Sequence, residues 1–181
     1  FLDEEIDVSK LPLSAGFQLA GLCSERDRAK KSLEIAYELR RRYSDNGEAH
    51  LKYIGVFLGG EKRFDTLLEP SKTAGVGMAV KVTNDMNQDQ WYILESRNDL
   101  NTHAGELDVA SDLGKRITGK KVNDEVVTAE GSIDKVVVKV TEIKSKYVHA
   151  FQESMRLLPE RFSDTKGLER VTFKSGTDEE T

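Results

Sequence analysis

The stretch SDLGKRITGKKVNDEVV, Ser111 to Val127, decides how the second half of this chain is interpreted. Its segment GKRITGKK is one residue short of a phosphate-binding P-loop, because Lys121 stands where Ser or Thr is needed. A P-loop also requires a buried strand before its first glycine and a helix that begins near its lysine. Here VASDL precedes Gly114, and the turn and strand residues KVNDEVV follow Lys120. The context therefore argues against a nucleotide site.

The same letters predict a short helix followed by a turn. Ser111 or Asp112 can accept hydrogen bonds from the first N–H groups of such a helix. Leu113 and Ile117 are four residues apart, so they share one face and can pack inward. Gly119 can take the left-handed conformation that ends a helix.

After the helix, we expect Val122 to point inward and Asn123-Asp124 to form a turn, because Asn tolerates a positive φ. The basic side chains of the stretch are expected on the solvent side: Lys115, Arg116, Lys120 and Lys121. They are either solvated or in contact with an acidic partner or phosphate. The stretch thus predicts one short helix packed on an antiparallel sheet.

Patterns on either side of this stretch predict an α+β chain. Alternating or β-branched runs indicate strands at 78–83, 90–95, 124–129 and 133–143, with a tight turn at 130–132. DMNQD, 85–89, is interpreted as a hairpin turn, and a helix is expected from Lys146 to Leu158, ending at Pro159. The predicted division is a helical segment at 1–69, a linker at 70–77, a sheet domain at 78–147, and a helix with a polar tail at 148–181.

Three helices are expected in the first segment, at 13–22, 27–43 and 45–60. Asp45 is predicted to cap the third helix. The Glu48 side chain would accept a hydrogen bond from the Asp45 N–H, which makes a capping box. NGEAH, 46–50, resembles the junction between two tetratricopeptide repeats, although His50 departs from the usual aromatic residue. Two interpretations stay open: the end of a longer helical array, or a plain helical hairpin packed on the next domain.

Composition bounds the class of protein. The chain has 181 residues, of which 38% are hydrophobic and 33% are charged. Its net charge of -5 argues against a protein dedicated to coating nucleic acid. The single cysteine, Cys23, fits a reducing cytoplasm. No apolar run approaches the roughly 18–20 residues of a membrane span. The start, FLDEEIDVSKL, is not a signal peptide. Because it lacks an initial Met, we expect a fragment of a longer protein or a chain trimmed at its N-terminus.

Residues 105–124, GELDVASDLGKRITGKKVND, resemble the C-terminal domain of the bacterial Gre transcript-cleavage factors. The family pattern G-x-I-S-x-x-S-P-L-x-x-A-L-x-G-K-x-x-G-D aligns without a gap, and the resemblance extends over about 78–147. It implies an FKBP-like fold, a curved antiparallel sheet around one short helix. Departures from the pattern include Asp112 in place of Pro, Arg116 in place of Ala and Asn123 in place of Gly.

The resemblance also implies a role. Gre factors cleave transcripts with an acidic, metal-holding tip on a long helical hairpin, and the helices expected here are too short and carry no such tip. We therefore expect a non-catalytic, cytoplasmic module, without metal or cofactor, that docks on RNA polymerase or another protein. The implied docking residues are Asp108, Ser111 and Asp112. Similar architectures carry a PIN nuclease-like domain, so a catalytic centre can lie outside this sequence.

The sequence leaves two other functions open. An FKBP-type peptidyl-prolyl isomerase is the alternative, but its apolar pocket needs aromatic walls, and only Trp91, Tyr92 and Tyr147 are available. A purely structural domain is the third possibility. The histidines His50, His103 and His149 have no ligand spacing for a metal and are expected to be structural or exposed. Stacking aromatics are absent from Ser111 to Val127, which counts against sequence-specific or single-strand nucleic-acid binding.

Overall fold

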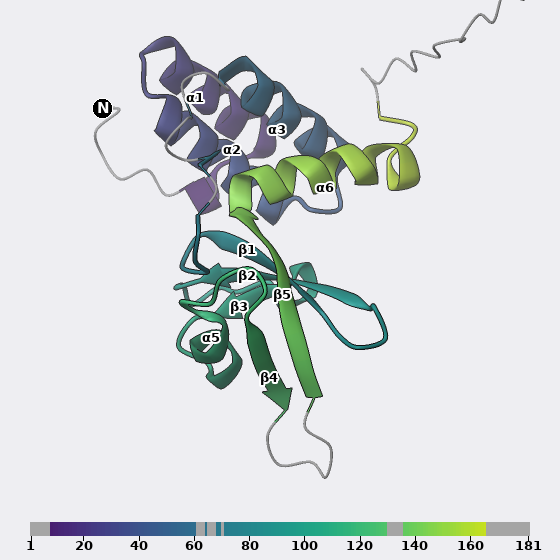
Figure 1. The fold of residues 1–181 in the computed structure, drawn as a ribbon. Helices are drawn as coiled ribbons and strands as arrows, with labels where there is room; N and C mark the ends of the chain where they lie inside the picture. Colours follow the sequence, from purple (N-terminus) through teal and green to yellow (C-terminus); the bar gives the residue numbers. More distant parts are fainter. Residues whose placement is uncertain (1–7, 61–63, 65–67, 70, 130–135, 166–181) are drawn as a thin grey trace, which may run out of the picture.

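Three α-helices in series open the structure, as the sequence predicts. The computed structural model describes residues 8–60, 64, 68–69, 71–129 and 136–165. The elements of the first part are η1 (Val8–Lys10), a 3-10 turn, and the helices α1 (Leu13–Glu25), α2 (Ala29–Arg42) and α3 (Gly47–Gly60). Helix α2 contacts both α1 and α3, and the three form the upper part of Figure 1. Whether they are tetratricopeptide-like stays a prediction.

Burial follows the helical period along α2. Leu33, Ala36 and Leu39 are each fully buried, and Tyr37 is 2% exposed. These positions recur every three or four residues, so they form one stripe that packs on the neighbouring helices. Arg40 lies on the same stripe and is 6% exposed, which makes it a charged group inside the helical core.

Asn46, rather than Asp45, caps α3. The Oδ1 atom of Asn46 accepts hydrogen bonds from the N–H groups of Glu48, at 2.9 Å, and Ala49, at 3.3 Å. The predicted capping box with Asp45 is therefore wrong. Asn46 directly precedes the first helical residue, so its side chain is the one within reach of the unpaired N–H groups. Asp45 is exposed and pairs with Arg161 across 3.4 Å.

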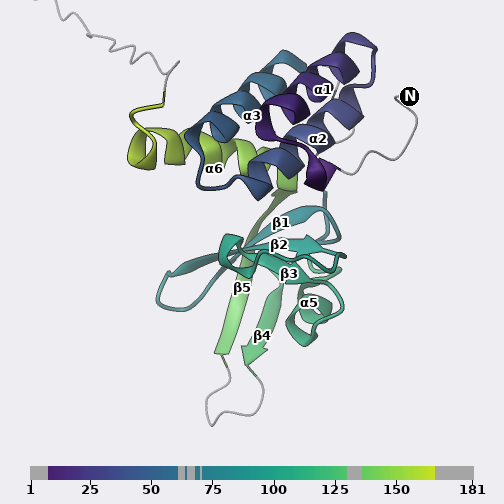
Figure 2. The same cartoon turned by 180° about the vertical axis from the view of Figure 1, so that it is seen from behind.

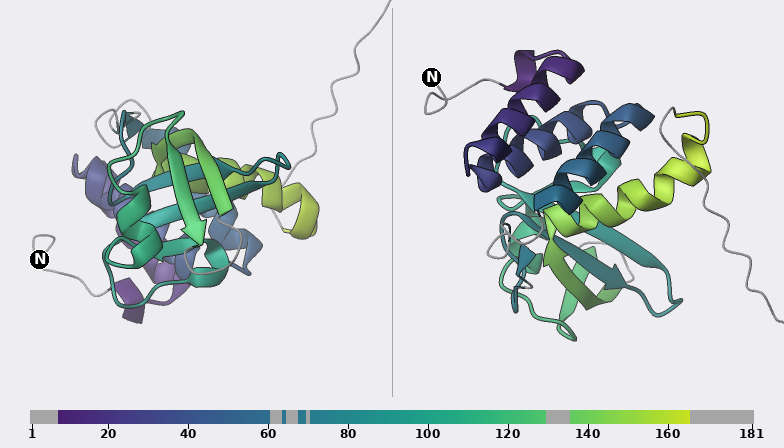
Figure 3. Two further views of the ribbon diagram at one scale, coloured as in Figure 1. Left: turned by 60° about the horizontal axis from the view of Figure 1, so that its bottom comes forward. Right: turned by 90° about the horizontal axis from the view of Figure 1, so that it is seen from above.

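A fourth helix, α6 (Lys146–Arg161), comes from the other end of the described chain and packs on α3. The Tyr53 hydroxyl donates to the Tyr147 carbonyl at 2.9 Å, and the rings of Phe57 and Phe151 stack with centroids 4.4 Å apart. Figure 2 and the right view of Figure 3 show α6 running beside α3. In the sequence, the strands of the sheet thus lie between α3 and α6, and in the structure these two helices pack together.

The predicted end of α6 at Pro159 is wrong, because the helix continues to Arg161. Leu158 is 2% exposed and anchors the last turn in the core. Its carbonyl accepts a hydrogen bond from Phe162 N at 3.0 Å, which closes the turn around the proline.

Five strands form one mixed sheet. They are β1 (Met78–Thr83), β2 (Asp89–Glu95), β3 (Glu106–Asp108), β4 (Glu125–Ala129) and β5 (Val136–Ser145). Their order is β3-β2-β1-β5-β4, and β3 runs parallel to β2 while the other pairs are antiparallel. The α+β class is confirmed and the wholly antiparallel sheet is corrected. The FKBP-like assignment stays a prediction.

The hairpin between β1 and β2 matches the predicted turn. Asn84 Oδ1 accepts hydrogen bonds from the N–H groups of Met86 and Gln88, and Asn87 takes a φ of 58°. This side-chain mimicry of a turn is typical of Asn. The other predicted turn, 130–132, lies outside the described residues.

The sheet has its own core, closed on one side by the short helix α5 (Asp112–Ile117). Ile117, Val80 and Leu94 are all fully buried and belong to one apolar cluster. Ala74, in the segment predicted as a linker, joins this cluster at 3% exposure. Its N–H donates to the Lys120 carbonyl at 2.7 Å and its carbonyl accepts from Gly119 N at 2.8 Å. Residues 119–120 and Ala74 therefore hold each other in place.

Candidate functional site: the docking loop

Ser111 organises the loop between β3 and α5. Its Oγ donates to the Asp108 carbonyl at 2.6 Å and accepts from Gly114 N at 3.0 Å. The Ser111 N–H donates to the same carbonyl at 3.0 Å. Ser111 is thus the N-cap residue of α5, one of the two residues that the sequence suggested for this role. We call residues 108–114 the docking loop.

Backbone contact fixes the docking loop further. A Cβ atom added to Gly114 would lie 2.0 Å from the Asp108 carbonyl oxygen and 2.8 Å from the Cα of Val109. Only glycine allows the first turn of α5 to come this close to the end of β3. The Asp108 carboxylate also accepts from Ala110 N at 2.8 Å. Two backbone segments are therefore locked together, with little freedom left in the loop.

The three predicted docking residues differ in exposure. Asp112 is exposed at the start of α5, whereas Ser111 and Asp108 are half-buried and bonded within the loop. An acidic residue in the first helical turn interacts favourably with the N-terminal end of the helix dipole. Asp112 is hence the exposed charged group of the docking loop, next to the capping residue Ser111.

The basic side chains divide into two pairs. Lys115 and Lys121 are exposed, and Arg116 and Lys120 are half-buried. The Arg116 guanidinium donates to the Val127 carbonyl at 3.1 Å, so it ties α5 to β4. The four residues therefore do not form a uniform basic face.

Val122 does not point inward. It is 45% exposed, and Val126, at 2% exposure, fills the core position instead. The cause lies at Asn123. Its φ of 80° reverses the chain, and its N–H donates to the Val140 carbonyl at 2.8 Å. The left-handed conformation predicted for this Asn is present, but its effect on the preceding valine was wrongly inferred.

Ion pairs that the sequence did not predict join the helices to the sheet. Arg41 of α2 bonds the Glu106 carboxylate of β3 twice, with Nε–Oε1 at 2.5 Å and Nη2–Oε2 at 2.8 Å. Arg97 donates to both carboxylate oxygens of Glu38 at 2.6 and 3.1 Å. Hydrogen bonds from Arg97 also lower the pKa of Asp99 to about 2. We call Arg41, Glu106, Arg97, Glu38 and Asp99 the clamp.

A second unpredicted set lies inside the helical part. Ser154 Oγ accepts from Arg40 Nε at 3.2 Å and lies 2.9 Å from His50 Nδ1, while Arg40 also pairs with Glu153. The other ring nitrogen of His50 lies 2.8 Å from the Ser44 carbonyl oxygen, and burial lowers the pKa of His50. Every member is buried or half-buried and bonded, so this set is structural. Its only sequence signal is that Arg40 and His50 fall on apolar stripes.

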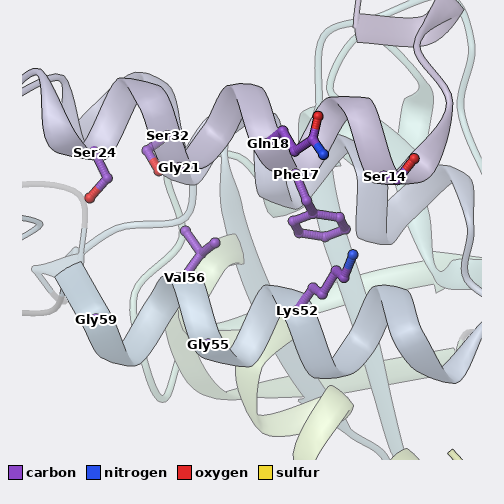
Figure 4. A pocket seen from close by; sticks show the side chains of 10 residues that line it. All are labelled: Ser14, Phe17, Gln18, Gly21, Ser24, Ser32, Lys52, Gly55, Val56 and Gly59. Atoms are coloured by element: carbon purple, nitrogen blue, oxygen red, sulfur yellow. The ribbon is translucent and has the colours of Figure 1, made fainter. Parts of the chain in front are cut away.

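A groove runs between α1 and α3, with a volume of about 520 Å³. Figure 4 shows Phe17 of α1 and Lys52 of α3 facing one another across it, and the Lys52 ammonium lies 5.8 Å from the Phe17 ring centroid. Ser32 lines the groove from α2. Its Oγ is the one side-chain polar atom, among the described residues, that is fully buried without a hydrogen-bond partner.

The described ranges lack two specific features. They contain no cluster of three or more His, Cys, Asp or Glu side chains that could hold a metal ion. No helix among them is long and apolar enough to cross a membrane. The three aromatic residues that an isomerase pocket would need occupy different surroundings: Trp91 lies against His149, Tyr92 packs on the sheet core, and Tyr147 packs edge-on to Tyr37.

Comparisons with known proteins give weak similarities of fold. No family model matches the chain, and no curated protein matches it. Among solved structures, the transcription elongation factor GreA/GreB from Nitrosomonas europaea is similar at 14% identity and a TM-score of 0.37, over 41% of this chain and 63% of that one. The chain therefore spans less than two thirds of that protein.

Two further structures cover more of their own length. GreA factor homolog 1 (Gfh1) of Thermus thermophilus is 19% identical with a TM-score of 0.34, over 74% of this chain and 95% of that one. Gfh1 of Thermus aquaticus is 18% identical with a TM-score of 0.35, over 72% and 94%.

Proposed function

We propose that this chain is a non-catalytic interaction module that docks on RNA polymerase through the docking loop, in the context of transcription elongation. The observation that carries the proposal is the locked geometry of the loop, with Ser111 capping α5 and Gly114 in contact with the Asp108 carbonyl. This geometry occurs in the segment whose sequence follows the Gre C-terminal pattern. Ser111 links the two features, because it belongs to the pattern and also makes the cap.

Rigidity is the physical reason for docking here. A partner that binds a loop with fixed backbone loses less conformational freedom than one that must order a mobile loop. Two hydrogen bonds of the Ser111 hydroxyl and the close contact of Gly114 with the Asp108 carbonyl already hold the docking loop. The affinity is therefore not reduced by the ordering of this segment.

Asp112 sets the expected chemistry of the partner surface. A proline at this position would stiffen the loop and carry no charge, whereas Asp112 is exposed and negative. A complementary partner surface presents Arg, Lys or free backbone N–H groups. Because Lys115 and Lys121 are exposed near by in sequence, the partner also needs a carboxylate or a carbonyl group at the edge of the contact.

A pull-down with purified RNA polymerase tests the proposal. The double variant Ser111→Arg/Asp112→Arg reverses the charge of the loop and removes the cap, and we expect it to lose binding. Asp85→Arg, at the exposed hairpin between β1 and β2, is the control charge reversal and should bind as the parent does. Circular dichroism confirms that each variant is folded. Equal retention of parent and double variant would show that the docking loop is not the contact.

Two activity assays complete the test. We expect no RNA cleavage when the chain is added to stalled polymerase, since α1, α2 and α3 are only 13, 14 and 14 residues long and do not form a long hairpin. We also expect no acceleration of prolyl isomerisation in a model peptide. Clear turnover in the second assay would favour the isomerase alternative over the docking module.

A further inference from the structure

A second hollow lies where the sheet meets α6. It has a volume of about 430 Å³ and is lined by β2, β5, α6 and the turn η3 (Thr102–Ala104). We call it the junction pocket. Its size falls in the range of small-ligand sites, and such sites favour places where two structural units meet.

His149 is the feature that distinguishes the junction pocket. It is 9% exposed, and neither of its ring nitrogens has a hydrogen-bond partner among the described residues. The other buried histidine of the helical part, His50, has polar contacts at both nitrogens, at 2.9 and 2.8 Å. These nitrogens are not among the fully buried, unpartnered polar atoms of the described residues, so they reach the solvent of the hollow and are available to a ligand that displaces water.

The aromatic wall beside His149 is Trp91. The two ring centroids are 4.5 Å apart, and the Lys144 ammonium lies 4.3 Å from the Trp91 centroid. A cation, an imidazole and an indole therefore meet at one wall of the pocket.

The carboxylates of the pocket are already engaged. Asp89 accepts from Lys81 and from Thr83, each at 2.7 Å. Glu153 pairs with the buried Arg40. Neither carboxylate is left to attract a cationic ligand.

The remaining hydrogen-bonding capacity consists of donors. Arg156 carries five N–H groups and uses one of them, at 2.7 Å, in an exposed i,i+4 pair with Glu160. Such pairs contribute little and are easily exchanged for a better partner. Lys144 donates to Gln152 at 2.5 Å and pairs with Glu142 at 2.6 Å, and the neutral imidazole of His149 adds one further N–H. An excess of donors selects a negatively charged ligand.

We propose that the junction pocket binds a small anion of the phosphate or carboxylate class, held by His149, Arg156 and Lys144 beside Trp91. This site is distinct from the docking loop. Burial lowers the pKa of His149 to about 4, so at neutral pH the ring is uncharged and serves as a hydrogen-bond donor. Charge neutralisation is left mainly to Arg156, because Lys144 is already paired with Glu142.

The chain has one tryptophan, Trp91, so its fluorescence reports directly on this pocket. The full chain is titrated at neutral pH with sodium phosphate and with sodium acetate, each against sodium chloride of equal ionic strength. We expect a saturable change of Trp91 emission with at least one of the two anions. A saturable response to phosphate alone or acetate alone assigns the class, and a response equal to that of chloride overturns the proposal.

Two substitutions on α6 give a matched pair. Arg156→Gln removes a lining cation, and Arg161→Gln removes an arginine that does not line the pocket. The two side chains are 58% and 57% exposed, and both are in exposed ion pairs. We expect Arg156→Gln to weaken anion binding about tenfold or more, as loss of a charge-assisted hydrogen bond does, and Arg161→Gln to change it less than about twofold. Equal effects of the two substitutions would show general electrostatic attraction and not a site.

Discussion

Replacement of Arg41 by Met tests the clamp between the helices and the sheet. Arg41 lies on α2 and its guanidinium bonds the Glu106 carboxylate on β3. We expect the substitution to lower the free energy of unfolding by about 3–5 kcal/mol, as breaking a buried ion pair does.

The magnitude follows from burial. The Glu106 side chain is 1% exposed and the Arg41 side chain 10%. Without the guanidinium, the described part of the chain leaves Glu106 one hydrogen bond, from Asn101 N at 2.7 Å, and no cation. Methionine retains most of the apolar stem of Arg41, so the loss reports the unpaired carboxylate more than lost packing. The effect is large, because the free energy of unfolding of a whole domain is only about 5–15 kcal/mol.

Urea unfolding followed by circular dichroism measures the change. Lys30→Met on the same helix is the control, because Lys30 is 71% exposed and its pair with Glu34 spans 3.9 Å; the expected change is within about 0.5 kcal/mol. Glu106→Gln completes a double-mutant cycle, and the double variant should lose less than the sum of the single losses. High salt should leave the Arg41 effect nearly unchanged, because buried pairs are weakly screened.

A loss below about 1 kcal/mol for Arg41→Met, or additive effects in the cycle, would refute this reasoning. The first result would mean that Glu106 is well solvated without its cation. The second would mean that the two side chains contribute independently and do not clamp the two parts together.

Two further predictions concern single buried groups. Ser32→Ala should raise the free energy of unfolding by about 1 kcal/mol, because it removes a buried hydroxyl without a partner and Ala favours the helix; a destabilisation of similar size in urea unfolding would contradict this. For His149, burial holds the folded pKa at about 4, below the value of about 6.5 in an unfolded chain. Its contribution to stability is therefore present above about pH 6.5 and lost as pH falls towards 4, by about 3 kcal/mol. Urea unfolding of His149→Gln should show a smaller decline over this interval than the parent, and parallel declines would exclude His149 as the cause.

Local patterns account for the elements that the sequence predicted well. The short helix α5 depends on a cap, a four-residue apolar spacing and a glycine, all within a few residues. The strand β1 was located at its observed bounds from alternation alone. In both cases the information that determines the structure lies inside the segment.

Elements that depend on distant partners were missed or misplaced. β3 has three residues and exists because Glu106, Leu107 and Asp108 pair with β2, so no pattern of its own marks it. The hydrogen bond from Asn123 to Val140 determines that the Val122 side chain faces the solvent and not the core. Sequence spacing does not reveal this bond.

The candidate site divides in the same way. The capping role of Ser111 follows from short-range chemistry, since its partners are three residues away. The clamp joins Arg41 to a carboxylate 65 residues further along the chain. His149 and Trp91 meet only because α6 packs beside the sheet, so their junction pocket could not be predicted from spacing.

The position of α6 has a consequence for synthesis of the protein on the ribosome. Helix α3 ends at Gly60 and α6 begins at Lys146, 86 residues later. At about 5–20 residues per second, roughly 4 to 17 seconds separate the two helices. During this interval Phe57 lacks the ring of Phe151, on which it later stacks. The nascent chain therefore presents an aromatic face that a chaperone can bind, and the sheet must be translated before that face is closed.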